Sequence, residues 1–206
     1  MTAEEHLDAI FTAERELRRH ERALLSGDAA TVGRLLAAQA HTAARECDGE
    51  ERRLRLERLA DLCAQVPGEA AVDALIQILD DDDPTARVAA GEALLDVAQE
   101  RFAAVARAIE SRIEAGEHGP AMRELPFVLA EIPEPGSLKL MQAFLRHPDA
   151  EVVAAAIDAS AEFGDPDLVP ALTALCDDAR EIWLEEDAQQ STIAVLARQA
   201  LDELGF

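Results

Sequence analysis

The second half of the chain repeats a short pattern, and this repetition restricts the fold more than any other feature of the sequence. In each repeat an acidic residue precedes an apolar one in the same slot, and the apolar residues are Val97, Ile132, Phe163 and Leu204. They lie 35, 31 and 41 residues apart. Each interval has room for two helices and a short turn, and such a pair needs neighbouring pairs to bury its apolar face. The spacing therefore predicts an α-solenoid in which the second helix of each pair ends at this slot.

The composition agrees with an all-α fold. Apolar residues make up 49% of the chain, whereas aromatic residues make up 3% and Tyr is absent. The core must therefore consist of Ala, Leu, Val and Ile. Long helical patterns are frequent, and runs of β-branched residues with the length of a strand are absent.

Two segments carry a more specific pattern. The first runs from Asp83-Pro84 through an Ala-rich stretch to Leu94, and the second runs from Pro148-Asp149 to Phe163-Gly164. In this respect the chain resembles the HEAT-repeat family, in particular its short bacterial form. The resemblance covers residues 69–205 and implies four repeats. The second repeat departs from the pattern because Gly119-Pro120 opens its helix, and the fourth carries an insertion.

Residues 1–66 match the repeats only as helices, and we expect them to form a helical N-terminal cap continuous with the solenoid. Thr2 and Glu5 form a capping-box pattern that predicts a helix over residues 3–25. Two further helices are expected to end near Arg45 and Val66. The first helix has an apolar stripe, formed by Leu7, Ile10, Phe11, Leu17, Leu24 and Leu25.

Charge is distributed unevenly along the chain, whose formal net charge is −23. Residues 1–60 hold ten Arg and twelve acids, whereas residues 61–206 hold nine basic residues and thirty acids. Such a field repels phosphate backbones, so we expect no nucleic-acid binding, and a basic protein is the natural partner. We expect the N-terminal Arg residues to meet acidic side chains, either within one chain or across a homo-oligomer. They are Arg15, Arg18, Arg19, Arg22, Arg52, Arg53, Arg55 and Arg58.

The sequence offers little support for catalysis. Paired His-Glu dipeptides, as in HEAT-like di-iron hydroxylases, would have to occur four times, and only His20-Glu21 has that order. The run Asp80–Asp83 lacks the alternating ligands and the Gly of a calcium loop, so we interpret it as a turn with Asp83 as an N-cap. The three Cys residues form no CxxC pair. We expect no catalytic residue, no metal site and no cofactor.

Two features remain as candidates for partner binding. The acidic residues of the repeated slot are Asp96, Glu131, Glu162 and Glu203, and stacked repeats would align them in a column on one face. The second feature is the insertion near residues 177–187, which contains Trp183 between acidic residues. We expect Trp183 to pack against the last helix and close the final repeat, and the alternative is that it contacts a partner.

These features favour a non-enzymatic scaffold, adaptor or inhibitor, such as an immunity-like protein or an assembly chaperone, that presents an acidic surface to a basic protein. The alternative is a HEAT-type enzyme such as a bilin lyase-like protein. The N-terminus has no signal-peptide pattern and no segment has the length of a membrane span, so we expect a cytoplasmic protein.

Overall fold

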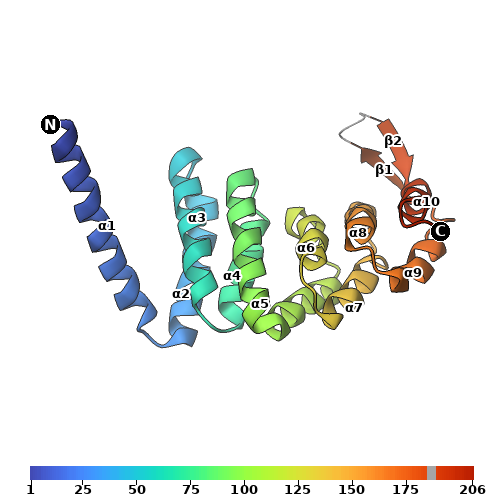
Figure 1. Cartoon of the computed structure of the whole chain (residues 1–206), viewed down its shortest axis with the longest axis horizontal. Helices are drawn as coiled ribbons and strands as arrows, with labels where there is room; N and C mark the ends of the chain where they lie inside the picture. Colours follow the sequence, from blue (N-terminus) through green and yellow to red (C-terminus); the bar gives the residue numbers. More distant parts are fainter. Residues whose placement is uncertain (185–188) are drawn as a thin grey trace.

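The computed structural model describes residues 1–184 and 189–206, and within them it is almost entirely helical (Figure 1). The long helices are α1 (Ala3–Leu25), α2 (Ala29–Glu46), α3 (Gly49–Gln65), α4 (Glu69–Leu79), α5 (Pro84–Ala115), α6 (Pro120–Ala130), α7 (Pro135–Phe144), α8 (Ala150–Phe163) and α10 (Ile193–Glu203). Between α8 and α10 lie the 3-10 turn η1 (Pro166–Leu168), the short α9 (Val169–Ala174) and a hairpin of β1 (Glu181–Leu184) and β2 (Gln189–Thr192). The predicted all-α solenoid is confirmed.

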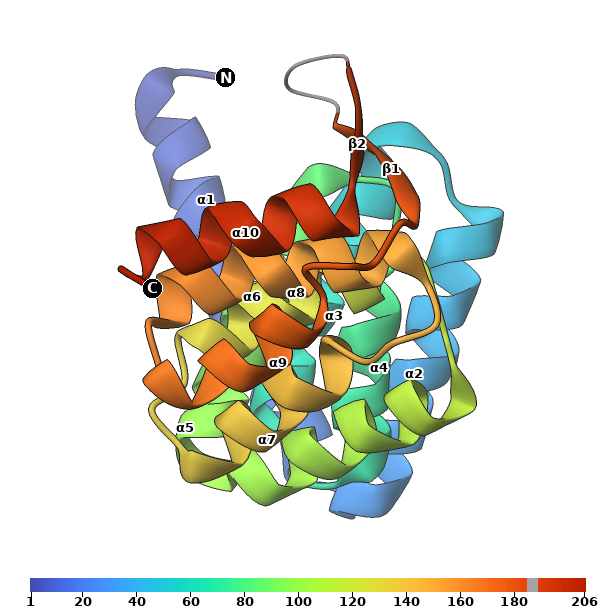
Figure 2. The same ribbon diagram turned by 90° about the vertical axis from the view of Figure 1, so that its right-hand side faces the viewer.

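The helices pack in two rows (Figures 1 and 2). One row contains the second helix of each pair, in the order α3, the first half of α5, α6, α8 and α10. The other contains α2, α4, the second half of α5, α7 and α9. Small side chains permit this close approach. Ala60, Ala90, Ala156 and Ala197 are almost completely buried, and each belongs to the row of second helices.

Side-chain caps fix where the helices begin. The carboxylate of Asp83 accepts hydrogen bonds from the backbone amides of Thr85 and Ala86, and Asp149 caps α8 in the same way. Helix α6 lacks a local side-chain cap, and the carboxylate of Asp80 accepts from the amide of Ala121 instead, at 3.0 Å. One side chain from the α4–α5 turn therefore fixes the start of a helix in the next repeat.

The end of the first repeat lies close to the predicted position, but it has an unexpected form. We expect its second helix to end near Val97, and α5 consists of two helices joined by a kink at Arg101, whose backbone is not helical (φ −139°, ψ 39°). The guanidinium of Arg101 donates to the carbonyl oxygens of Ala64 and Val66, at 2.5 and 2.9 Å. This contact ties the kink to the end of α3. A kink at Arg101, rather than a loop, therefore separates the second helix of this repeat from the first helix of the next one.

Helix α1 has the predicted boundaries and the predicted capping box, but its packing differs from that of the other helices. It stands away from α3 at the end of the solenoid, whereas the β1–β2 hairpin projects from the opposite end (Figure 1). No residue of α1 is buried. Its predicted apolar stripe is therefore largely exposed, and α2 and α3, which pack on α4 and α5, continue the two rows.

Candidate functional site

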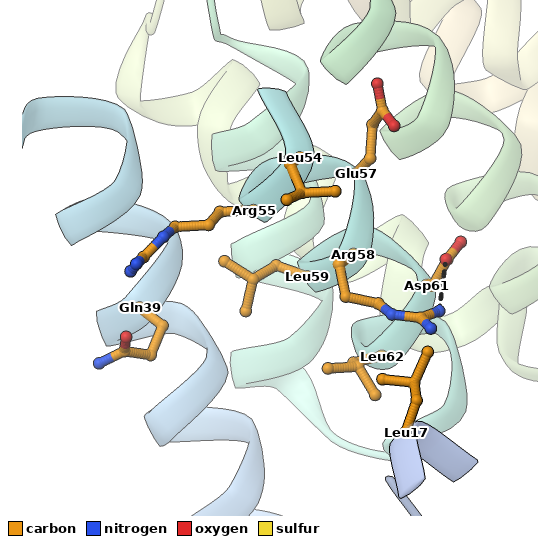
Figure 3. Close-up of a pocket in the computed structure, with 9 residues that line it drawn as sticks. All are labelled: Leu17, Gln39, Leu54, Arg55, Glu57, Arg58, Leu59, Asp61 and Leu62. Carbon is orange, nitrogen blue, oxygen red and sulfur yellow. Dashed lines mark hydrogen bonds and ion pairs between the residues drawn. The ribbon is translucent and has the colours of Figure 1, made fainter. Parts of the chain in front are cut away.

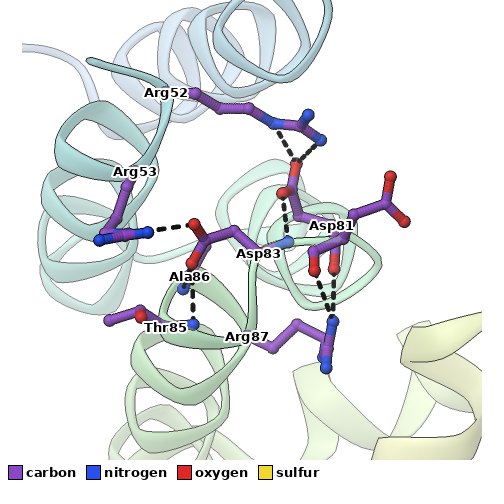
Figure 4. Close-up of polar contacts among 8 residues, drawn as sticks. Arg52, Arg53, Asp81, Asp83, Thr85, Ala86 and Arg87 are labelled. Carbon is purple, nitrogen blue, oxygen red and sulfur yellow. Dashed lines mark hydrogen bonds and ion pairs between the residues drawn. The ribbon is translucent and has the colours of Figure 1, made fainter. Parts of the chain in front are cut away.

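The run of aspartates forms the α4–α5 turn and is occupied by contacts within the chain (Figure 4). Arg52 of α3 donates from Nε and Nη2 to one oxygen of Asp81, which is only 4% exposed. Arg53 donates from Nε to Asp83 at 3.0 Å. Partial burial alone would raise the pKa of Asp83, but the hydrogen bonds from Arg53 and two backbone amides lower it. The turn interpretation is confirmed, and Arg52 and Arg53 meet acidic residues of the repeats within one chain.

The four acidic residues of the repeated slot lie at the carboxyl-terminal ends of second helices. Asp96 is in the first half of α5, Glu131 follows α6, Glu162 ends α8 and Glu203 ends α10. Each of the four is exposed. Within the part of the chain that the structure describes, none of them forms an ion pair. Their charges are therefore available to a partner in solution.

Two of these acids line one cavity. Glu162 and Glu203 face the space between α8 and α10, whose volume is about 320 Å³. The cavity is also lined by Asp158, Ala161, Leu196, Gln199 and Ala200. Asp96 and Glu131 occupy the corresponding ends of the preceding second helices and lie outside this cavity. Of the four acids in the repeated slot, the last two therefore share this cavity.

The expectation that Trp183 closes the final repeat is wrong. Its side chain is 57% exposed, whereas the neighbouring Ile182 is 4% exposed. Both lie in β1, whose side chains alternate between the two faces of the hairpin. Ile182 packs toward the core, so Trp183 must point outward, where it lies opposite Gln190 in the antiparallel register. The acidic residues 185–187 of the predicted insertion lie outside the described residues.

The base of the hairpin is held by Arg180, which the sequence analysis did not single out. Its guanidinium donates to both carboxylate oxygens of Asp178 and to the carbonyl oxygens of His147 and Pro148. The hydrogen bond from Arg180 lowers the pKa of Asp178. These bonds fix the hairpin to the α7–α8 turn, so Trp183 is carried on an anchored element.

Sequence analysis also missed a groove between α1 and α3, because no repeat pattern marks it (Figure 3). Its volume is about 570 Å³, and its apolar wall contains Leu17, Leu54, Leu59 and Leu62. Arg58 spans the groove, since it pairs with Glu21 of α1 at 2.9 Å and with Asp61 of α3 at 3.2 Å. The groove is therefore an apolar surface with a charged border.

Comparison with known protein families agrees with this geometry. Residues 122–193, from α6 to the start of α10, match the family described as HEAT repeats. This match supports the assignment of this part of the chain to the HEAT repeats. The match includes Glu131, Glu162 and Trp183, whereas Asp96 and Glu203 lie in the helix pairs that flank it. No curated protein shows significant sequence similarity to the chain.

Burial shifts the pKa of two groups in the chain. Burial lowers the pKa of His147, whose Nδ1 accepts a hydrogen bond from the amide of Asp149 at 3.1 Å. Burial raises the pKa of the Cys63 thiol to about 12. Across residues 1–184 and 189–206, no three His, Cys, Asp or Glu side chains are grouped as metal ligands. The same residues include no helix that is long and apolar enough to cross a membrane.

Proposed function

We propose that this chain is a non-catalytic scaffold that binds a basic protein through the acidic ends of its second helices. HEAT repeats generally mediate protein–protein interactions, and residues 122–193 match that family. The observation that carries the proposal is the unpaired, exposed state of Asp96, Glu131, Glu162 and Glu203. Four like charges at equivalent helix ends give a negative potential along one face, which attracts a positively charged surface.

The surrounding surface supports an extended contact. The 320 Å³ cavity between α8 and α10 has two of the four carboxylates and the apolar side chain of Leu196 in its wall. An Arg or Lys side chain fits such a site, since its aliphatic stem packs on apolar atoms while its charged end meets a carboxylate. Trp183 adds an exposed aromatic side chain on the same terminal repeat, and Trp is enriched at interface hot spots.

The causes of the shifted pKa values support the non-catalytic part of the proposal. Active sites concentrate perturbed titratable groups in a cleft. Here Asp28, Asp83 and Asp178 have lowered pKa values, because the hydrogen bonds that they accept outweigh the effect of burial. Cys63 is buried in the core. Each of these groups has a structural role in a different part of the chain.

The test uses an Arg-rich peptide as the probe and fluorescence anisotropy as the measurement. Conversion of Asp96, Glu131, Glu162 and Glu203 to Lys should weaken binding at least roughly thirtyfold at low salt. The matched control converts four other exposed acids to Lys, namely Glu46, Glu50, Glu110 and Glu114. It has the same net charge and should retain most of the affinity. Equal losses in the two variants would mean that only net charge matters, and the proposed surface would be wrong.

A further inference from the structure

Helix α1 is amphipathic, but none of its residues is buried. Leu7, Ile10, Phe11 and Leu17 are 50%, 62%, 52% and 37% exposed. A helix of this kind obtains most of its stability from packing of its apolar face, and an isolated one is marginal in water. A helix of 23 residues is about 35 Å long, so the exposed stripe is extended. An exposed apolar stripe of this length is typical of a surface that packs against another apolar surface.

Charged residues beside the stripe restrict the orientation of a helix that covers it. Glu4, Phe11 and Arg18 are spaced by seven residues, so they lie on the same flank of α1. If two copies of α1 run antiparallel with Phe11 at the two-fold axis, Glu4 of each copy lies opposite Arg18 of the other. A parallel pair would instead place like charges together. Arg18 also pairs with Glu14 of its own helix at 2.7 Å, and the same alignment places Asp8 opposite Glu14, so the charges favour the antiparallel orientation over the parallel one without matching at every position.

The rest of the molecule favours the same contact. Residues 1–60 carry nearly balanced charge, whereas residues 61–206 are strongly acidic. Two copies that met through their repeats would bring acidic faces together, and an antiparallel pair of α1 helices sends the two solenoids to opposite ends. Leu17 also lines the 570 Å³ groove beside α3, so the stripe continues into that apolar surface.

We propose that two copies of this chain form a two-fold dimer through antiparallel α1 helices, with the apolar stripe of each helix covered by the other. This inference does not depend on the proposed partner of the acidic face. It leaves Glu131, Glu162 and Glu203 of both copies exposed, so the dimer would present two acidic faces. A bivalent scaffold binds a repeated or dimeric partner more tightly than one face alone.

The first test measures the mass of the full chain by sedimentation equilibrium between 1 and 100 µM (roughly the range of dimer dissociation constants for small interfaces). We expect a species of twice the 22.2 kDa chain mass. Ile10→Gln with Phe11→Gln should raise the dissociation constant at least roughly hundredfold. The control, Val88→Gln with Val195→Gln, changes two exposed apolar residues outside α1 and should leave it unchanged. A wild-type monomer at all concentrations, or equal dimers in both variants, would overturn the proposal.

The second test examines the antiparallel orientation. Glu4→Arg alone and Arg18→Glu alone should each weaken the dimer roughly tenfold, because each places like charges opposite one another twice. The double variant Glu4→Arg, Arg18→Glu restores opposite charges across the axis and should return to within about threefold of wild type. Arg18→Glu also removes the exposed Arg18–Glu14 pair within α1, in the single and the double variant alike, so recovery in the double variant reports the contact between copies. Additive weakening in the double variant would contradict the antiparallel dimer.

Discussion

Arg101 and Val66 are joined across 35 residues of sequence, because Nη1 of Arg101 donates to the carbonyl oxygen of Val66 at 2.9 Å. The carbonyl oxygens at the end of a helix lack partners within it, and a guanidinium satisfies two of them here. The same residue has the non-helical backbone conformation that bends α5. One side chain therefore caps α3 and holds the angle between two successive repeats.

The Arg101 contact predicts a measurable loss of stability. Arg101→Met keeps much of the apolar stem but removes both charged hydrogen bonds, and it should lower the free energy of unfolding by about 2–3 kcal/mol. The measurement is urea denaturation followed by circular dichroism. Arg107→Met is the matched control, because Arg107 is more than half exposed and pairs with an exposed Glu69. Similar losses in the two variants would show that the Arg101 contact has no special role.

Ile182 and Trp183 provide a test of the hairpin, since they are adjacent in sequence and opposite in exposure. Ile182→Ala should cost about 2–4 kcal/mol of stability, whereas Trp183→Ala should cost less than about 1 kcal/mol. Trp183 is the only Trp of the chain, so its fluorescence reports on this position alone. We expect emission typical of a solvated indole and efficient quenching by acrylamide. A blue-shifted, protected spectrum would contradict the outward orientation.

His147 predicts a pH dependence between pH 7 and pH 5. Its pKa in the folded state is lowered from 6.5 because burial disfavours the charged imidazole. The unfolded chain therefore takes up the proton first, and stability falls as pH drops below about 6.5. His147→Asn keeps an acceptor for the amide of Asp149 but does not titrate, so it should flatten the curve in this interval. The exposed His6→Asn variant should keep the wild-type curve. Thermal melts across the interval decide between these outcomes.

Salt should stabilise the chain. The acidic residues of the repeats repel one another, and moderate salt screens that repulsion. We expect the melting temperature to rise by about 2–5 °C between 0.02 and 0.3 M NaCl, roughly the change that 1 kcal/mol produces in a chain of this size. The ion pairs Arg52–Asp81 and Arg53–Asp83 oppose this trend, although the partly buried first pair is screened little. A lower melting temperature in salt would mean that such pairs outweigh the net repulsion.

The sequence predicted those parts of the fold that depend on local signals. Asp83 and Asp149 are caps at the start of second helices, and Gly164 has the left-handed conformation (φ 67°) that ends α8 where the repeated slot predicted. The bend in α5 has no such signal, because neither Gly nor Pro occurs near Arg101 and a contact to a distant carbonyl holds it. A kink in place of a turn between these two helices therefore could not be predicted.

The candidate site was predicted in part. The repeat spacing placed the four acids at equivalent exposed helix ends, but only the packing of α8 on α10 shows that Glu162 and Glu203 share a cavity. The sequence predicts that Trp183 packs on the last helix, because a terminal repeat must cover its own apolar edge. The two-residue alternation of a strand reverses that conclusion for every second residue. The α1–α3 groove depends on the angle at which α1 leaves α2, which no local pattern determines.

Site-directed photo-crosslinking in the cells that make this protein tests the central claim most directly. A photoreactive residue replaces Gln199, which lines the cavity with Glu162 and Glu203, and a control chain carries it at the exposed Ser111 in the second half of α5. We predict that position 199 crosslinks to a protein with a positively charged surface, that position 111 does not, and that Glu162→Lys with Glu203→Lys abolishes the product. Crosslinks from position 111 alone, or an unchanged product in the Lys variant, would contradict the account.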